Sequence, residues 1–547
     1  MVLRRNRLPQ TPDSKQQMIK HRPFLAFATV ALWVGLVAGC ASPGPVAPAV
    51  APSAPTPVTL AAPFGDHAVI QRDKPVPVWG HAGPGDPVTV TFHGQTQGTV
   101  AGADGNWSVT LAPLGASSQP ADMVVTGRNS VTLHDIVVGE VWLCSGQSNM
   151  EFTVDDGGST YRVQNAEAEV AGANYPLIRQ LKVDRTVKTA PSDTVKTSGW
   201  QPAAPDIVGH FTAVGYFFAR DIHRALGVPV GIIDSPWGGT PVESWMSDAA
   251  RNSTSLAATL EVRWKKAMSE WPPERVARYP ADMEAWQKAE KEAMATHTRN
   301  PLHWPNPPAT EDSPALPGGL YNGMIAPLQP FAIRGILWYQ GEANVGHPDE
   351  YAELFETLIR SWRTTFGQGD LPFYFVQLAN FGNEDERANR DWARLREAQA
   401  QALALPNTGM AVTIDIGEAH NIHPRNKQEV GRRLALIARA KIYGLPPESS
   451  GPMFESATPE GPAIRVRFTH AGSELTVRDG TIKSLEVAGS DQVFHPAAAV
   501  LQVDSLLASS PDVPQPVAVR YAWTNAPEAN LYGDSGLPAV PFRSDHW

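Results

Sequence analysis

One stretch decides the fold: residues 139–150 have the sequence Gly-Glu-Val-Trp-Leu-Cys-Ser-Gly-Gln-Ser-Asn-Met. It begins as a hydrophobic run typical of a buried β-strand, and the pattern breaks abruptly at Gly146. A small polar cluster with one serine, Ser148, follows. Hydrolases built on an α/β sheet place their nucleophile at this point, because backbone amides converge on an oxyanion at the carboxyl end of a strand. On its own, the cluster also fits a tight turn with a structural serine.

The composition is that of a large globular protein. The chain has 547 residues, with 42% hydrophobic and 18% charged residues, and it is long enough for several domains. A formal net charge of −10 argues against nucleic acid and anionic membrane surfaces as partners. The sequence has no CxxC or HExxH spacing, and we expect neither a metal nor a cofactor.

The N-terminus predicts export. Basic residues at positions 20–22 precede an apolar run at 24–37, which is too short to span a membrane comfortably. The following Val-Ala-Gly-Cys resembles a bacterial lipobox, in which Cys40 becomes the lipidated first residue after removal of a signal peptide at 1–39. The alternative is an uncleaved helix with a buried cysteine. The Ala/Pro-rich residues 40–58 then form a tether. We therefore expect a periplasmic or outer-membrane-anchored bacterial lipoprotein that contacts the membrane only through its lipid.

The rest of the chain divides by its hydrophobic patterns. Residues 59–135 show short alternating strands separated by turn residues, as in a small β-sandwich. Residues 136–250 and 314–450 alternate strands with helices, which predicts a mostly parallel sheet with helices on both faces. Residues 451–547 return to β-type alternation. The expected fold class is α/β, a parallel-sheet hydrolase domain flanked by small β-sandwich-like domains.

Three further polar clusters follow predicted strands. Gly238-Gly239 exposes bare backbone amides, residues 338–344 present an amide and a carboxylate, and residues 415–424 contain His420 and His423 just before a helix. The carboxyl ends of parallel strands meet at one edge of a sheet, so these clusters should gather around Ser148. Ester hydrolysis by serine needs an oxyanion hole, a base and a group that orients the base. The clusters together predict a serine esterase.

These blocks resemble the sialate O-acetylesterase family within the SGNH hydrolase superfamily. The matching motifs are Gly-Gln-Ser-Asn-Met at 146–150, Trp-Gly-Gly-Thr at 237–240, Trp-Tyr-Gln-Gly-Glu-Ala-Asn at 338–344 and Ile-His-Pro-Arg-Asn-Lys at 422–427. The likeness extends from about Ala68 to Asp545. Members of the family remove acetyl groups from sugars, sialic acids in some and plant cell-wall hemicelluloses in others. The resemblance implies an acetylated carbohydrate as substrate. The four converging clusters predict that the reaction proceeds through an acetyl-enzyme.

Roles follow from the same resemblance. Ser148 corresponds to the nucleophile and His423 to the general base. The backbone N–H groups of Ser148 and Gly239 and the side-chain amide of Gln340 correspond to the oxyanion hole. Trp237 and Asn344 are candidates for substrate contact, although Asn344 fits a structural role in its loop equally well.

The acid of the triad is where the sequence departs from the family pattern. SGNH enzymes usually place an Asp three residues before the base, and His420 occupies that position here. Glu342 is the favoured substitute. Asp415 and Glu418 are weaker alternatives, and a Ser-His dyad whose ring is held by Asn421 or a backbone carbonyl is another.

Residues 251–313 interrupt the strand–helix pattern with a Trp-rich insertion that includes Trp264, Trp271, Trp286 and Trp304. It is either a surface insertion or a wall of the substrate cleft whose Trp rings stack on sugars. Two other functions compete with the acetylesterase: a non-catalytic glycan-binding surface lipoprotein, and an SGNH lipase or thioesterase. Among acetylated glycans, export and the insertion favour hemicellulose such as xylan or xyloglucan.

Overall fold

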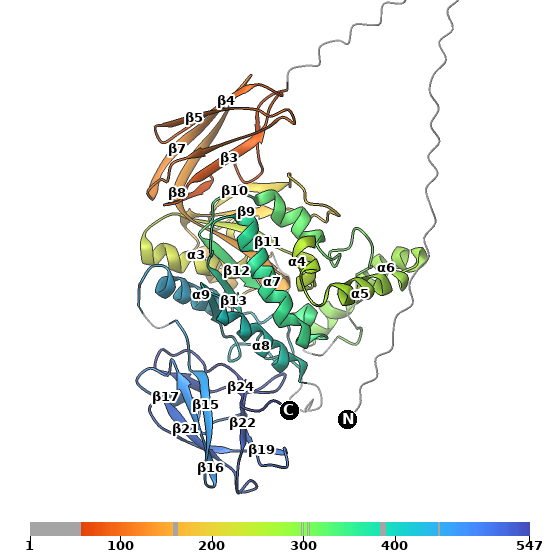
Figure 1. Cartoon of the computed structure of the whole chain (residues 1–547), viewed down its shortest axis with the longest axis vertical. Helices are drawn as coiled ribbons and strands as arrows, with labels where there is room; N and C mark the ends of the chain where they lie inside the picture. The colour runs from red at the N-terminus through yellow and green to blue at the C-terminus, as the bar shows by residue number, and fades with distance from the viewer. Residues whose placement is uncertain are drawn as a thin grey trace, which may run out of the picture. The chain divides into compact units, whose positions relative to one another are not determined.

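The computed structural model describes residues 56–156, 162–296, 298, 300–303, 305, 307–382, 390–446 and 449–547 (Figure 1). The predicted signal peptide, the lipobox with Cys40, most of the tether and Trp304 lie outside the described residues. None of the described helices is both long and apolar enough to cross a membrane.

A largely parallel sheet forms the centre of the fold. Its strand order is β10–β9–β11–β8–β12–β13–β14. The strands from β9 to β14 pair in parallel, whereas β10 pairs antiparallel with β9 at one edge. The bounds are β8 (Ser130–Gly146), β9 (Tyr175–Val183), β10 (Thr197–Ala203), β11 (Val230–Pro236), β12 (Gly335–Tyr339), β13 (Phe373–Val376) and β14 (Thr408–Ala411). The predicted α/β class is confirmed.

Helices cover both faces of this sheet. Trp142 of β8 packs edge-on against Phe218 of helix α3 (Ala213–Leu226), with ring centroids 4.9 Å apart. Trp338 of β12 points to the opposite face, where it meets Phe355 and Trp362 of α7 (Pro348–Phe366). Helix α9 (Lys427–Lys441) packs beside α3, and α8 (Asp391–Gln401) packs beside α7 (Figure 1). The sheet is therefore buried on both sides, as the apolar strands predict.

The crossing of α3 and α9 requires a glycine. A Cβ on Gly431 of α9 would lie 2.7 Å from the Cβ of Phe217 and 2.9 Å from the carbonyl oxygen of Val214. These distances are shorter than van der Waals contact, so a side chain here would push the helices apart. This close packing fixes the position of the start of α9, which lies next to the site described below.

Strand β8 belongs to two parts of the fold. Its first half pairs antiparallel with β7 (Ser117–Thr126), and its second half lies in the central sheet. It thus continues across position 135, where the sequence places the end of the N-terminal β domain. Glu140 lies buried in its middle, and the carboxylate pairs with Arg72 at 2.5 Å and Arg334 at 2.6 Å.

The two ends of the described chain are β-rich. The N-terminal strands are β1 (Thr59–Leu60), β2 (Val69–Gln71), β3 (Val76–His81), β4 (Pro87–Phe92), β5 (Gln95–Val100), β6 (Asn106–Leu111) and β7. The C-terminal strands are β15 (Met453–Glu460), β16 (Ala463–Thr469), β17 (Leu475–Val477), β18 (Leu485–Ala488), β19 (Phe494–Pro496), β20 (Ala498–Leu501), β21 (Ser505–Ser509), β22 (Ala518–Tyr521), β23 (Leu531–Gly533) and β24 (Phe542–Arg543). The C-terminal strands pair antiparallel.

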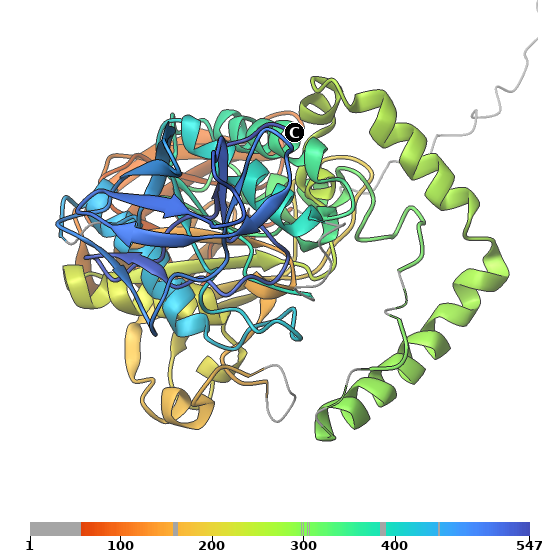
Figure 2. The ribbon, with the colours of Figure 1, turned by 90° about the horizontal axis from the view of Figure 1, so that it is seen from below.

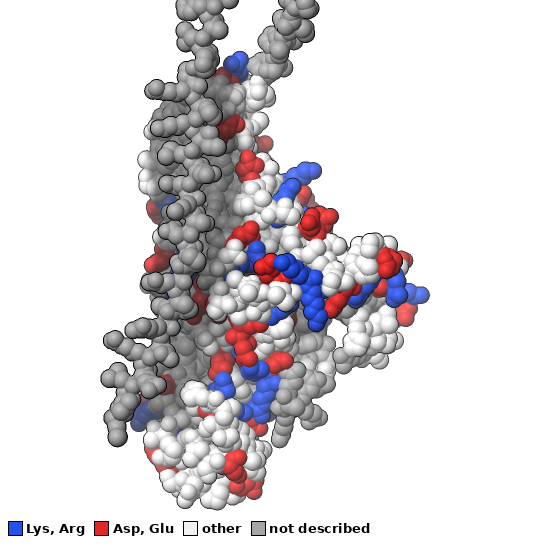
Figure 3. All heavy atoms as spheres, turned by 45° about the vertical axis from the view of Figure 1, so that its right-hand side comes forward, with Lys and Arg blue, Asp and Glu red and all other residues white. Residues whose placement is uncertain are grey.

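Residues 248–295 form three helices. They are α4 (Asp248–Asn252), α5 (Ala257–Ser269) and α6 (Pro273–Ala295), and Figure 2 shows the segment of α5 and α6 standing apart from the sheet. Arg263 of α5 pairs with Glu350 of α7 at 2.6 Å and so anchors the insertion. Trp271 is covered within the insertion itself, by Arg275 at 4.1 Å from its ring centroid and by the edge of Tyr279. Acidic and basic side chains are interspersed over the face shown in Figure 3. Within α6, Arg278 pairs with Asp282 at 3.0 Å.

The remaining described helices are short. They are α1 (Ser148–Glu151), α2 (Ala166–Ala171), η1 (Val208–His210), η2 (Val242–Trp245), η3 (Tyr321–Ile325), η4 (Ala326–Leu328), η5 (Glu342–Asn344) and η6 (Ala402–Ala404).

Candidate active site

Ser148 stands at the point where β8 ends. Gly146 has a φ of +130°, and a Cβ there would lie 2.2 Å from the carbonyl oxygen of Tyr339 in β12. Only glycine tolerates both the backbone conformation and this close approach. The chain can therefore turn sharply into α1, whose first residue is Ser148. This places Ser148, half-buried, at the carboxyl edge of the sheet.

His423 lies directly against this serine. Its Nε2 is 2.8 Å from the Oγ of Ser148, across 275 residues of sequence. The loop that carries His423 runs between β14 and α9. It is held by Asn421 and Glu418, two of the sequence-based candidates for orienting the base. Asn421 Oδ1 accepts the backbone N–H of His423 at 3.0 Å, and Glu418 accepts the Asn421 side-chain amide at 3.1 Å. Glu418 and Asn421 therefore shape the loop around the base.

The electrostatics keep this histidine neutral. Burial, together with the nearby ammonium of Lys427, lowers the pKa of His423 to about 3. A neutral imidazole can accept a proton from a hydroxyl group, whereas an imidazolium cannot. A neutral His423 can therefore accept the proton of Ser148 at neutral pH.

Glu342 lies in the same corner but makes a different contact. Its Oε1 accepts the side-chain amide of Asn149 at 2.5 Å, and the same amide nitrogen donates to the carbonyl oxygen of Ile422 at 3.0 Å. Oε2 of Glu342 is buried without a hydrogen-bond partner among the described residues. Burial raises the pKa of Glu342, whereas the hydrogen bond from Asn149 and the charge of Lys427 lower it. The carboxylate thus reaches the histidine loop through Asn149.

The turn that contains Gly238 and Gly239 lies beside Ser148. A Cβ on Gly238 would lie 3.1 Å from the Cβ of Ser148, so this turn presses against the nucleophile. Gly238 donates its N–H to Glu151 Oε2 at 2.9 Å, and Gly239 adopts a left-handed φ of +73°. Among the described residues, no acceptor is recorded for the N–H of Gly239.

Gln340 and Asn344 form a buried wall behind this turn. Gln340 Nε2 donates to Asn344 Oδ1 at 2.7 Å and to the carbonyl oxygen of Thr240 at 3.2 Å. Asn344 also accepts the N–H of Val242 and donates to Glu243. Asn344 is only 4% exposed, so in this structure it braces the loop.

Two side chains of opposite character, Trp237 and Arg185, lie beside the turn. Trp237 is partly buried and faces the guanidinium of Arg185, which lies 5.5 Å from its ring centroid. Arg185 Nε donates to Glu151 Oε1 at 2.9 Å. The Arg185–Glu151 pair therefore holds the Gly238 turn from outside, and the Arg185 side chain is 54% exposed.

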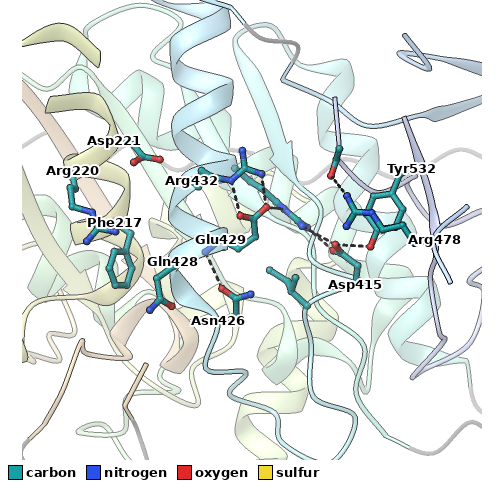
Figure 4. A pocket seen from close by; sticks show the side chains of 13 residues that line it. Phe217, Arg220, Asp221, Asp415, Asn426, Gln428, Glu429, Arg432, Arg478 and Tyr532 are labelled. Carbon is teal, nitrogen blue, oxygen red and sulfur yellow. Dashed lines mark hydrogen bonds and ion pairs between the residues drawn. The ribbon is translucent and has the colours of Figure 1, made fainter. Parts of the chain in front are cut away.

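Asp415 has a structural partner instead of a catalytic one (Figure 4). Its carboxylate pairs with Arg433 of α9 at 2.6 Å and accepts the hydroxyl of Tyr532 from β23 at 3.1 Å. Both members of the ion pair are buried. They line a polar pocket of about 510 Å³ that also includes Arg432 and Arg478. Asp415 thus joins a C-terminal strand to α9.

Sequence reasoning missed several residues at the site. Asn149 and Lys427 stand inside the recognised motifs but received no role, although their position beside Ser148 and near His423 was a usable signal. Glu151 and Arg185 gave no comparable signal, because their pairing appears only in the fold. Among the described residues, no three His, Cys, Asp or Glu side chains are grouped so as to hold a metal ion.

Comparison with known proteins now adds to this geometry. The family described as "Carbohydrate esterase, sialic acid-specific acetylesterase" matches residues 303–439. The sialate O-acetylesterase of Rattus norvegicus is 30% identical over 537 residues, covering 88% of this chain and 93% of the rat protein. The chain belongs to the sialate O-acetylesterase family. The Mus musculus sialate O-acetylesterase is likewise 30% identical, over 87% of this chain and 92% of its own.

A solved structure supports the same family. The crystal structure of a carbohydrate acetylesterase from Xanthomonas citri superposes with a TM-score of 0.75 at 37% identity, covering 90% of this chain and all of that one. The resemblance read from the motifs is therefore confirmed, and the chain is a carboxylic ester hydrolase of the sialate O-acetylesterase family.

The contacts of Asp415 generate a prediction. Asp415→Asn removes the negative charge that pairs with Arg433. Breaking a buried ion pair lowers the free energy of unfolding by about 3 kcal/mol. The loss should be smaller here because Glu429 also pairs with Arg433, at 2.8 Å. We expect a lower free energy of unfolding, measured in urea. The kcat for p-nitrophenyl acetate should stay within about threefold of the wild type, because the surroundings of Ser148 do not change. A loss of kcat of about 100-fold or more at unchanged stability would instead make Asp415 the triad acid.

Proposed function

We propose that the protein is a serine carbohydrate esterase that removes O-acetyl groups from glycans through an acetyl-enzyme. The observation that carries the proposal is the 2.8 Å contact between His423 Nε2 and Ser148 Oγ at the carboxyl edge of the sheet. The neighbouring Gly238 turn supports it, because a serine nucleophile needs backbone donors beside it.

In the first half of the reaction, Ser148 Oγ attacks the acetyl carbonyl carbon while His423 Nε2 takes the hydroxyl proton. The carbonyl oxygen becomes an oxyanion facing the N–H groups of Ser148 and Gly239. The intermediate then collapses, the bond between the acetyl carbon and the sugar oxygen breaks, and His423 returns the proton to that oxygen. The sugar leaves with a free hydroxyl, and the acetyl group stays on Ser148.

In the second half, His423 takes a proton from water as the water attacks the carbonyl carbon of the acetyl-enzyme. The bond between that carbon and Ser148 Oγ then breaks, His423 returns the proton to Oγ, and acetic acid leaves and ionises to acetate. Gln340 is the third oxyanion donor implied by the family resemblance. Its Nε2 bonds Asn344 and Thr240 in the structure, so this role requires its release from one of them. Glu342 supplies the acidic group, and it acts on His423 through Asn149 and the peptide of Ile422.

For the substrate, we propose an acetylated hemicellulose such as xylan or xyloglucan, with acetylated sialic acids as the alternative. The expected export, the tether and the Trp-rich insertion support an enzyme that meets extracytoplasmic glycans. The Xanthomonas citri relative is described as a carbohydrate acetylesterase, and the rodent relatives as sialate O-acetylesterases. The proposed location is periplasmic or at the outer membrane, through a lipid on Cys40.

The catalytic pair gives a direct test. Ser148→Ala and His423→Ala should each lower kcat for p-nitrophenyl acetate by about 10³–10⁶-fold, because the nucleophile and its base act as a unit. Circular dichroism checks the fold of each variant. Near-normal turnover by purified Ser148→Ala would refute the mechanism and favour a non-catalytic glycan-binding protein.

The same proteins report the substrate. Acetate release from a panel of acetylated xylan, xyloglucan and sialic acids should be greatest with a hemicellulose, and Ser148→Ala should abolish it. Rates on p-nitrophenyl esters should fall steeply beyond acyl chains of about two to three carbons if the pocket fits acetate. A preference for longer chains would point to the lipase or thioesterase alternative.

Glu342→Gln separates the triad from a dyad. We expect a kcat loss of more than about tenfold, since the neutral amide no longer provides the negative charge that stabilises the His423 imidazolium in the transition state. The measurement is kcat for p-nitrophenyl acetate with stability in urea as control. A smaller loss in a folded variant would leave a Ser-His dyad as the catalytic unit.

A further inference from the structure

A lysine is buried where a fold alone would not place one. Lys427 is 0% exposed and forms the first residue of helix α9. Burial removes the hydration of an ammonium group, and a positive charge at a helix N-terminus opposes the helix dipole. Burial accordingly lowers the pKa of Lys427 to about 7, although Glu342 and Glu418 favour the charged form. An apolar side chain would fill this space without either penalty, so the lysine calls for a functional reason.

The contacts of the ammonium supply that reason. Its Nζ donates to Asn149 Oδ1 at 2.5 Å and lies 4.8 Å from the ring centroid of Phe152 and 5.4 Å from that of Tyr339. An ammonium can only donate hydrogen bonds, so Asn149 has to turn its oxygen toward Lys427. Its amide nitrogen then faces the opposite way, toward Glu342 Oε1 and the carbonyl oxygen of Ile422. Lys427 therefore decides the orientation of the Asn149 carboxamide.

That carboxamide connects the two catalytic residues through their neighbours in the chain. Asn149 directly follows Ser148, and Ile422 directly precedes His423. We propose that Lys427 is a positioning residue, which fixes the Asn149 amide and thereby holds the histidine loop at hydrogen-bonding distance from the serine. The inference rests on the proposed Ser148–His423 mechanism and adds to it a residue that touches neither the substrate nor the reacting atoms.

The lysine also acts on the base through its charge. Among the described residues, the charged and titratable groups on or beside the histidine loop include Lys427 from α9, Glu342 from η5, the Tyr339 hydroxyl from β12, and Glu418, His420 and Arg425 from the loop itself. The ammonium disfavours protonation of His423 and so keeps the base available in acidic solution. Glu342 offsets the ammonium when the imidazolium forms during the reaction.

The test compares Lys427→Met with Lys441→Met in the full chain. Both substitutions remove an ammonium from α9, but Lys441 donates to the carbonyl oxygen of Thr408 at 2.9 Å, in no contact with the network. For Lys427→Met we expect kcat for p-nitrophenyl acetate to fall by about 10–100-fold with KM changed less than about threefold, because misplaced catalytic groups cost turnover. The acidic limb of kcat/KM should move to higher pH by about one unit, since a nearby positive charge no longer opposes imidazolium formation. Lys441→Met should change neither quantity.

A double-mutant comparison shows whether the lysine acts through Asn149. Asn149→Ala should reproduce the kcat loss, and adding Lys427→Met to it should lower kcat by no more than about twofold further, because coupled residues are not additive. Fully additive losses would overturn the proposed route. If Lys427→Met leaves Glu342 as an unpaired buried charge and so fails to fold, the double variant Lys427→Met/Glu342→Gln is compared with Glu342→Gln alone. Relative to Glu342→Gln, the double variant should show the kcat loss expected for Lys427→Met.

The outcomes separate this inference from the mechanism on which it rests. Wild-type kcat and an unmoved acidic limb in folded Lys427→Met would overturn the positioning role, while an inactive Ser148→Ala would leave the serine mechanism standing. Full activity in Ser148→Ala would overturn both.

Discussion

The site depends on one close approach of two strands. Gly146 at the end of β8 lies so near the carbonyl oxygen of Tyr339 in β12 that no side chain fits between them. This contact lets the chain leave the sheet in a sharp turn, and the Gln147 N–H secures the turn by donating to the Tyr339 carbonyl at 2.9 Å. Gln147 Oε1 then accepts the N–H of Ala343 at 3.1 Å. The serine turn and the Glu342 loop are therefore a single packed unit to which the histidine loop attaches.

The three carboxylates considered for the acid of the triad are distinguished by their contacts. Asp415 is satisfied by Arg433 and Tyr532, which leaves it to hold the C-terminal strand β23. Glu418 accepts hydrogen bonds within the histidine loop, from the side-chain amide of Asn421 and from the backbone N–H of Arg425. Of the three, Glu342 is the one that accepts a hydrogen bond from the buried Asn149 side chain. Burying a charge lowers the free energy of unfolding unless the charge is paired and hydrogen-bonded. The cluster of Glu342, Asn149 and Lys427 therefore costs stability, and its hydrogen bonds give the site a defined geometry.

Much of this arrangement could be predicted from local sequence. Gly146, Ser148, Gly239 and His423 stand in polar clusters after apolar strands, and the parallel sheet brings such clusters to one edge. The long strand β8 could not be predicted, because its burial changes from one face to both faces near residue 136 and the hydrophobic period changes with it. The bond of Lys427 to Asn149 was equally hidden. It joins two segments far apart in the chain, and local residue spacing carries no information about how such segments pack.

The central claim is that Ser148 carries the acetyl group between the two halves of the reaction. The most direct measurement is peptide mass spectrometry of the protein quenched with acid during turnover of p-nitrophenyl acetate. The account predicts an added mass of one acetyl group on the peptide that contains Ser148 and none on that peptide in Ser148→Ala. Turnover without any acetylated peptide, or with the acetyl group on another residue, would contradict it.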